Sequence, residues 1–321
     1  MERSKEIDKM REVMGTLPSM QPKKKTEFIR GCSRIKVELI GYPLNPYKQI
    51  FEAATATWGD DDYEYKWPKV SVENRIKVVR ASLEGKTLPQ ALESITFQFR
   101  VNGVSRSAFD QAARARVGAT FFSSGVRDNN KLDASFIMPT ELYDNRELRK
   151  DIEEYVKMGK DLYEKIISKG QGSWQSARCI LPMGMNHPFE FSMTYLALMG
   201  QCSRRLKFCE QEDTVGLFWS VREALKDKFP LLAIYLRPSC DRTKRCQYHE
   251  SYSLSEMFGC LFKSCGRNSD NSPYVYATFN RACTVKDVLE EQLGFKIPNS
   301  NEDLPENYEI DVKDYEYFAA L

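Results

Sequence analysis

The sequence contains no long apolar stretch, almost no excess of charge and only 2 histidines in 321 residues. Because a membrane-spanning helix needs a run of roughly 20 apolar residues, no membrane protein is expected. The formal net charge of +2 is too small to indicate a binder of polymeric nucleic acid. Residues 1–15 are charged and lack the apolar core of a signal peptide, so a cytoplasmic location is expected.

Several motifs of familiar enzyme classes are missing too. There is no P-loop, no GxGxxG motif after a strand and no HExxH motif, which argues against the classes that these motifs define. A Cys-His hydrolase stays open, although neither histidine is paired with a nucleophile in a recognisable way. The 9 cysteines are expected to be reduced thiols, several of them buried.

The overall amino-acid composition is that of a globular protein with a substantial core. Hydrophobic residues make up 42% of the chain and charged residues 29%, which is usual for a folded domain. Near the start, a lysine run follows Pro22. Residues 1–30 are therefore expected to form a charged helix and a linker.

Alternating and helical patterns predict a mixed α/β fold. Apolar residues alternate with polar ones at 35–39 and at 95–101, which is the period of a strand with one buried face. A helix is expected after Ser71, which can cap its first turn, and it would end at Gly85. Further helical patterns occur at 147–170, 191–211 and 217–229.

The stretch 104–127 holds four arginines among glycines and hydroxyl residues. Ser105 or Ser107 can cap a helix that is expected to run to Gly118, and two of the arginines would lie on different faces of it. Guanidinium groups bind phosphate in a bidentate manner, and a glycine-containing loop lets backbone amides approach the same anion. Two interpretations stay open: an anion-binding site, or arginines on a solvent-exposed helix.

Three segments then follow one another in an informative order. The strand TFQF is followed by GVSR, by a Gln-x-x-Arg-x-Arg pattern that begins at Gln111, and by a hydroxyl-rich loop that closes on Arg127. A tyrosine-containing helix leads to Ala-Arg, whose arginine is Arg178, and then to Leu-Pro; Arg205 comes later. In this order the segments resemble the flavin-dependent thymidylate synthase family, over roughly residues 33–235.

The resemblance implies an α/β (α+β) fold of the thymidylate synthase-complementing type, in which helices flank an antiparallel or mixed sheet. It divides the chain into the charged segment 1–30, a family-like domain 31–235 and a cysteine-containing C-terminal extension 236–321. It also implies a homotetramer, because the family builds its sites between subunits.

Residue roles follow from the resemblance position by position. Arg205 matches the catalytic arginine, which is expected to stabilise the ionised pyrimidine ring. The nucleotide-binding positions are Gln111, Arg114, Ser123, Ser124, Gly125, Val126, Arg127 and Arg178. The cofactor-binding positions are Arg114, Ala115, Arg116 and Glu93.

The activity that the resemblance implies is a flavin-dependent one-carbon transfer to C5 of a pyrimidine nucleotide monophosphate such as dUMP. FAD would be the cofactor, with NADPH and methylenetetrahydrofolate as co-substrates. Methylation and hydroxymethylation both stay open, as do a uracil or cytosine base and a ribose or deoxyribose sugar.

The sequence departs from the family pattern mainly at flavin-side positions. Ala115 replaces the central His of the family's Arg-His-Arg, Gly125 replaces a Ser, and Glu93 stands without a neighbouring His. The family's Asn-x-Arg flavin contact falls on Thr-Tyr-Leu at 194–196. The alternative function is therefore a nucleotide-binding sensor or assembly subunit that has lost the flavin chemistry.

A second group of chemically active residues lies in the C-terminal extension. It offers enough ligands for a tetrahedral zinc ion, although paired CxxC knuckles are missing. Its members are Cys240, Cys246, His249, Cys260 and Cys265. The alternative is a helix with buried thiols. The other histidine, His187, precedes a proline and is expected to be a loop residue rather than a base.

Overall fold

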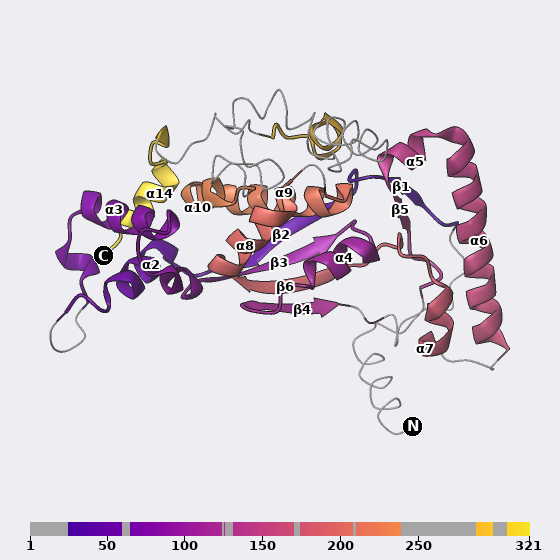
Figure 1. Cartoon of the computed structure of the whole chain (residues 1–321), viewed down its shortest axis with the longest axis horizontal. Coiled ribbons are helices and arrows are strands. Elements are labelled where there is room, and N and C mark those ends of the chain that lie inside the picture. The colour runs from indigo at the N-terminus through magenta and orange to yellow at the C-terminus, as the bar shows by residue number, and fades with distance from the viewer. Residues whose placement is uncertain are drawn as a thin grey trace, which may run out of the picture.

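A four-stranded antiparallel sheet forms the centre of the computed structural model (Figure 1). The structure describes residues 25–59, 65–123, 125, 131–169, 174–207, 210–238, 287–297 and 307–321. In sheet order the strands are β2 (Lys36–Gly41), β3 (Thr96–Asn102), β6 (Phe189–Thr194) and β4 (Ala119–Ser123). A separate parallel pair consists of β1 (Phe28–Arg30) and β5 (Phe136–Met138). The predicted antiparallel sheet flanked by helices is confirmed.

Helices lie in three groups around this sheet (Figure 1). At one end are α2 (Pro46–Thr55), α3 (Val72–Leu83) and α14 (Val312–Ala319). At the other end are α5 (Thr140–Asp144), α6 (Arg146–Ser168) and α7 (Trp174–Ala177). Between them are α4 (Arg106–Ala112), α8 (Tyr195–Arg205), α9 (Glu212–Lys226) and α10 (Pro230–Tyr235), and α9 packs against β2. Short 3₁₀ helices are η1 (Trp67–Lys69), η2 (Pro89–Glu93) and η3 (Arg178–Ile180).

The alternating pattern of β3 places one face of the sheet in the core. Phe97 and Phe99 are fully buried, whereas the intervening Gln98 is exposed. Phe99 pairs with Phe191 of β6, and their rings stack with centroids 5.1 Å apart. The strand predicted at 95–101 is thus confirmed, and it lies in the interior of the sheet.

Local signals also set the bounds of α3, as predicted. The Ser71 side chain accepts a hydrogen bond from the backbone N–H of Asn74, which caps the first turn. Beyond the last turn, Gly85 has a φ of 73°, in the left-handed region that glycine adopts without a steric penalty. The helices predicted at 147–170 and 217–229 are confirmed as α6 and α9.

Two predicted helices were wrong in extent. The pattern at 191–211 begins as a strand, because β6 alternates buried and half-buried residues up to Thr194, which then caps α8. The helix expected to run to Gly118 ends at Ala112. The chain must turn there to bring β4 alongside β6, and this tertiary pairing overrides the helical propensity of the alanines.

Described parts of the C-terminal extension pack into the main core. The Phe318 ring is fully buried and stacks on Tyr47, with centroids 4.4 Å apart. The buried Asp314 carboxylate accepts hydrogen bonds from Tyr47 and Tyr308. Leu289 belongs to the same core. The division at 235 stays a prediction, but the described residues on its two sides share one interior.

Few described residues belong to the predicted segment 1–30. Residues 1–24, where a charged helix is expected, lie outside the described part of the chain. The last three residues of the segment form β1, which pairs in parallel with β5. Within the described residues, no helix combines the length and apolar character needed to cross a membrane.

Candidate functional site

Arg205, at the end of α8, lies at the centre of a polar cluster. Its Nη1 donates to Oε1 of Gln111 at 2.8 Å and forms an ion pair with Oε2 of Glu210 at 2.7 Å. Its side chain is 14% exposed, and its buried Nε has no hydrogen-bond partner among the residues that the structure describes. The structure therefore brings together two residues that were predicted separately, Arg205 and Gln111, and leaves one buried donor for a ligand to satisfy.

The start of α9 supplies contacts that the sequence did not predict. Oε1 of Gln211 accepts hydrogen bonds from Oγ of Ser107 at 2.9 Å and from Nε2 of Gln111 at 3.0 Å. Asp213 accepts from the backbone N–H of Ser105 at 3.1 Å. Burial raises the pKa of the Asp213 carboxyl, and the hydrogen bond from Ser105 offsets part of that rise. These contacts join residues about a hundred positions apart, so no local sequence pattern predicts them.

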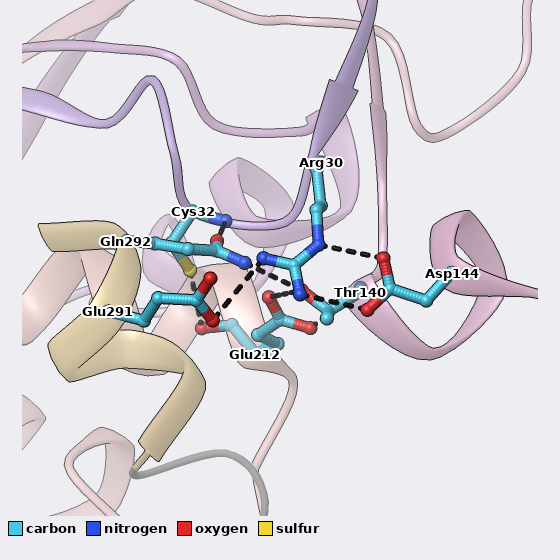
Figure 2. Close-up of polar contacts among 7 residues, drawn as sticks. All are labelled: Arg30, Cys32, Thr140, Asp144, Glu212, Glu291 and Gln292. Atoms are coloured by element: carbon cyan, nitrogen blue, oxygen red, sulfur yellow. Dashed lines mark hydrogen bonds and ion pairs between the residues drawn. The ribbon is translucent and has the colours of Figure 1, made fainter.

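The same turn is held on its other side by a second group of hydrogen bonds (Figure 2). The Glu212 carboxylate accepts from the backbone N–H of Thr140 at 2.9 Å and from its hydroxyl at 2.7 Å. Gln292, from the helical segment 287–293, donates to the Thr140 hydroxyl at 2.9 Å and accepts from the Cys32 N–H at 2.5 Å. Nearby ion pairs join Arg30 to Asp144 and Glu291.

A cavity of about 190 Å³ lies between these two groups of contacts. Its polar lining includes Ser107, Gln211 and Asp213, and its apolar lining includes Phe136 and Met183. The turn that begins α9 thus forms a wall of the cavity while it contacts Arg205.

Three predicted ligand-binding arginines lie at the surface. Arg114, Arg116 and Arg178 are exposed, and their side chains make no hydrogen bond or ion pair within the described residues. Since α4 ends at Ala112, Arg114 and Arg116 lie in the connection to β4 and not on a helix as predicted. Unpaired guanidinium groups of this kind are available to bind anions.

The predicted phosphate loop is only partly described. Ser123, the first residue of the predicted loop 123–127, is the last residue of the strand β4. Ser124, Val126 and Arg127 lie outside the described residues, whereas Gly125 lies within them.

The other predicted cofactor positions differ in exposure. The Ala115 side chain is partly buried and packs against the core. Glu93 is exposed at the end of η2. At the position of the family's Asn-x-Arg contact, Thr194 caps α8 and Tyr195 is buried, with its hydroxyl donating to the Leu232 carbonyl at 2.7 Å. These two side chains therefore have structural roles.

His187 lies in a loop, as predicted, but its side chain is buried. It packs on the Phe109 ring, with centroids 4.5 Å apart, and its Nε2 lies 3.3 Å from Nη1 of Arg106. Burial, together with the neighbouring Arg106, lowers the pKa of His187 to about 4. The imidazole is therefore neutral at physiological pH.

The predicted zinc ligands lie outside the described residues, and this interpretation stays a prediction. The group consists of Cys240, Cys246, His249, Cys260 and Cys265. Among the residues that are described, no group of three or more His, Cys, Asp or Glu side chains is arranged to hold a metal ion.

The antiparallel sheet and the helices that flank it define a class: an α/β protein of the thymidylate synthase-complementing type. The family model described as "Thymidylate synthase complementing protein" matches residues 38–231. This match covers more than half of the chain, and the chain belongs to that family. The resemblance seen in the sequence is thereby confirmed, and the modest identity to its relatives marks a divergent member.

Individual relatives agree with this assignment. A flavin-dependent thymidylate synthase of Pyrococcus furiosus is 26% identical over 193 residues, which cover 59% of this chain and 75% of the relative. One of Pyrococcus abyssi is 24% identical over 227 residues, which cover 67% and 91%. Among solved structures, the UMP/dUMP methylase PolB of Streptomyces cacaoi, bound with 5-Br dUMP, has a TM-score of 0.52 at 16% identity. That match covers 65% of this chain and 96% of PolB, and it supports the fold.

Proposed function

We propose that the protein is a flavin-dependent enzyme that transfers a one-carbon unit to C5 of a pyrimidine nucleotide monophosphate such as dUMP. The observation that carries the proposal is Arg205, which Gln111 and Glu210 hold in place while its buried Nε finds no partner within the described part of the chain. The family and the names of the relatives support the reaction class. The solved PolB structure adds a nucleotide ligand in a protein of the same fold.

Arg205 is proposed to act on the pyrimidine ring. When the ring N–H is ionised, the negative charge is shared by the ring nitrogen and the neighbouring carbonyl oxygens, and the electron-rich ring can then attack an electrophile through C5. A half-buried guanidinium that is already oriented stabilises this charge without reorganising during the reaction. The ion pair with Glu210 does not remove this ability, because the guanidinium keeps further N–H groups, including the unpartnered Nε.

Nucleotide binding is proposed to use the predicted set of polar and charged residues around this point. Gln111 faces Arg205, and the exposed Arg178 is free to bind phosphate. We propose the loop from Ser123 to Arg127 as the second phosphate contact, because it combines hydroxyl groups, a glycine and an arginine.

The residues that are described fit an anionic cofactor such as FAD. Arg114 and Arg116 present unpaired guanidinium groups, which suit a pyrophosphate, and the Glu93 carboxylate can accept a hydrogen bond from a hydroxyl or amino group. The Ala115 position offers only backbone groups. When bound, the flavin would supply the reducing electrons of the transfer.

Three finer points belong to the same proposal. NADPH is the reductant and methylenetetrahydrofolate the one-carbon donor, with a methyl or hydroxymethyl product. The active protein is a homotetramer, which the apolar side chains on the surface of α6 support: Leu148, Tyr155, Met158 and Leu162 are 45–64% exposed. The cytoplasmic location expected from the sequence stays a prediction.

The alternative is a nucleotide-binding sensor without flavin chemistry. Ala115 favours it, as do the structural roles of Thr194 and Tyr195, because these residues stand where the family has flavin contacts. The comparisons do not favour it, because the relatives and the structural neighbour carry the names of enzymes.

Two arginine variants test the proposal. Arg178→Ala removes contacts made equally in the ground and transition states, so nucleotide affinity should fall by roughly 1.5–3 kcal/mol with saturated turnover preserved. Arg205→Ala should bind nucleotide nearly normally but lose on the order of 10²-fold in turnover. Nucleotide affinity and single-turnover rates are measured for both variants. Arg34→Ala is the control, because the Arg34 side chain is 66% exposed. Unchanged affinity and rate in both variants would contradict the proposed roles.

A further inference from the structure

The cavity of about 190 Å³ beside the start of α9 contains polar groups that the proposed reaction does not use. It is smaller than the roughly 300–1,000 Å³ of pockets that enclose drug-sized ligands, so it has room for one ring system. Phe136, Ile137 and Pro139 supply apolar walls. Met183, which also lines the cavity and is 54% exposed, marks the side on which the cavity meets solvent. A ring can therefore enter while the rest of its molecule stays outside.

Asp213 is a hydrogen-bond acceptor in this lining that lacks a full set of partners. The residue is 5% exposed, and its Oδ2 accepts from the backbone N–H of Ser105 at 3.1 Å. Its buried Oδ1 has no hydrogen-bond partner among the described residues. Glu212 also lines the cavity, but its two oxygens accept from Thr140 (Figure 2). Because buried polar atoms are nearly always paired, we expect a molecule in the cavity to donate to Asp213.

Gln211, which lines the same cavity, determines what the ligand presents next to its donors. Its Oε1 accepts from Ser107 at 2.9 Å and from Gln111 at 3.0 Å. With that oxygen engaged, the NH₂ group is the end of the amide that can bind a ligand. A carboxylate accepts two parallel N–H bonds, and the amide donates one. The complementary ligand edge is therefore donor, donor, acceptor.

We infer that this cavity binds the 2-amino-4-oxopyrimidine edge of a fused heterocycle. In that edge an NH₂ group, a ring N–H and a carbonyl stand side by side. The two donors form parallel hydrogen bonds to the Asp213 carboxylate, as in the strong bidentate pairs that carboxylates form with arginine, and the carbonyl accepts from Gln211. Uracil and cytosine do not carry this order of groups, so the cavity does not duplicate the proposed pyrimidine site.

Two kinds of molecule carry this edge: a pterin, which is the head of the proposed one-carbon donor, and a guanine nucleoside. The pterin source rests on the proposed function, whereas the guanine source does not. The cavity adjoins the proposed nucleotide site, because Gln111 donates to Gln211 and accepts from Arg205 at 2.8 Å. A pterin here would lie beside the pyrimidine, and a guanine nucleoside would be an effector bound next to it.

Ligand pairs that differ at one group test the inference on the wild-type protein. Isothermal titration calorimetry, without nucleotide or flavin, compares pterin with lumazine, in which a carbonyl replaces the NH₂ group. We expect lumazine to bind at least about 10-fold more weakly, because it turns an acceptor toward the carboxylate. Guanosine is compared with inosine, which lacks the NH₂ group. Binding of pterin alone assigns the cavity to the one-carbon donor, and binding of guanosine assigns it to an effector.

Asp213→Asn separates recognition from packing, because it keeps the size of the side chain and an acceptor for Ser105. Its new NH₂ group opposes the NH₂ group of pterin but donates to the carbonyl of lumazine. We expect pterin affinity to fall about 10- to 100-fold and the preference between the two ligands to reverse. A role in packing alone would weaken both alike. Asp110→Asn is the matched control, since the 42% exposed Asp110 side chain pairs with Arg106 and does not line the cavity; both Kd values should stay within about twofold.

The wild-type comparison decides the matter even if Asp213→Asn does not fold. If neither pterin nor guanosine binds, or if pterin and lumazine bind equally, the inference is overturned, and an ordered water is left as the partner of Oδ1. Failure of the proposed function gives a different result. A protein that modifies dUMP but binds neither ring contradicts only this inference, whereas one that binds guanosine over inosine but modifies no nucleotide contradicts only the proposed function.

Discussion

Replacing Phe318 by alanine tests whether the C-terminal helix α14 is part of the folding core. The Phe318 ring is fully buried, stacks on Tyr47 at 4.4 Å and lies 6.2 Å from the Trp67 ring. Truncation of a buried phenylalanine removes this apolar contact and leaves a cavity, at a cost of about 3–5 kcal/mol of unfolding free energy. Urea unfolding should show this as a lower midpoint with an unchanged slope.

Tyr315→Ala provides the comparison within the same helix. Tyr315 is 52% exposed, so its loss should cost less than about 1 kcal/mol. If Phe318→Ala cost no more than Tyr315→Ala, the docking of α14 against Tyr47 and Trp67 would be refuted. A large cost would mean that residues beyond the family-matched region, 38–231, stabilise the fold.

Two further predictions concern a buried histidine and a buried lysine. Burial and Arg106 lower the pKa of His187 to about 4 in the folded protein. The unfolded chain therefore binds the proton more tightly, and the free energy of unfolding should fall as the pH drops from about 6.5 to 4. His187→Gln should flatten this acid-side loss, on the order of 2 kcal/mol, in unfolding measured against pH; an equally steep profile would contradict it. Lys160 donates to the carbonyls of Leu132 and Ala134 at 2.7 and 2.5 Å, so Lys160→Met should cost about 2–3 kcal/mol of unfolding free energy in urea, and an unchanged midpoint would contradict that.

Local signals were sufficient for much of the fold. The alternation of 95–101 predicted β3, and Ser71 with Gly85 predicted the two ends of α3. They failed where one element runs directly into the next, because the strand β6 passes into α8 at Thr194 without a glycine or proline between them. The alternation from Phe189 onward was nevertheless present in the sequence, and a strand period would have found it.

The site was predictable only in part. Matching motifs indicated Arg205 and Gln111, but not that the two side chains meet. The sequence gives no signal for Glu210 and Gln211, since their importance comes from tertiary contacts with Arg205 of α8 and Gln111 of α4. For the same reason the buried position of Phe318 was unexpected: the contacts that bury it involve residues more than two hundred positions away in the sequence.

The central claim is that this chain carries out flavin-dependent one-carbon transfer to C5 of a pyrimidine nucleotide. The most direct test incubates the purified protein, reconstituted with FAD, with NADPH, methylenetetrahydrofolate and either dUMP or dCMP, and analyses the nucleotide by mass spectrometry. The account predicts flavin absorption that bleaches on addition of NADPH, and a nucleotide that gains a methyl or hydroxymethyl group on its base. A protein that binds dUMP or dCMP but takes up no flavin and leaves both nucleotides unmodified would contradict it.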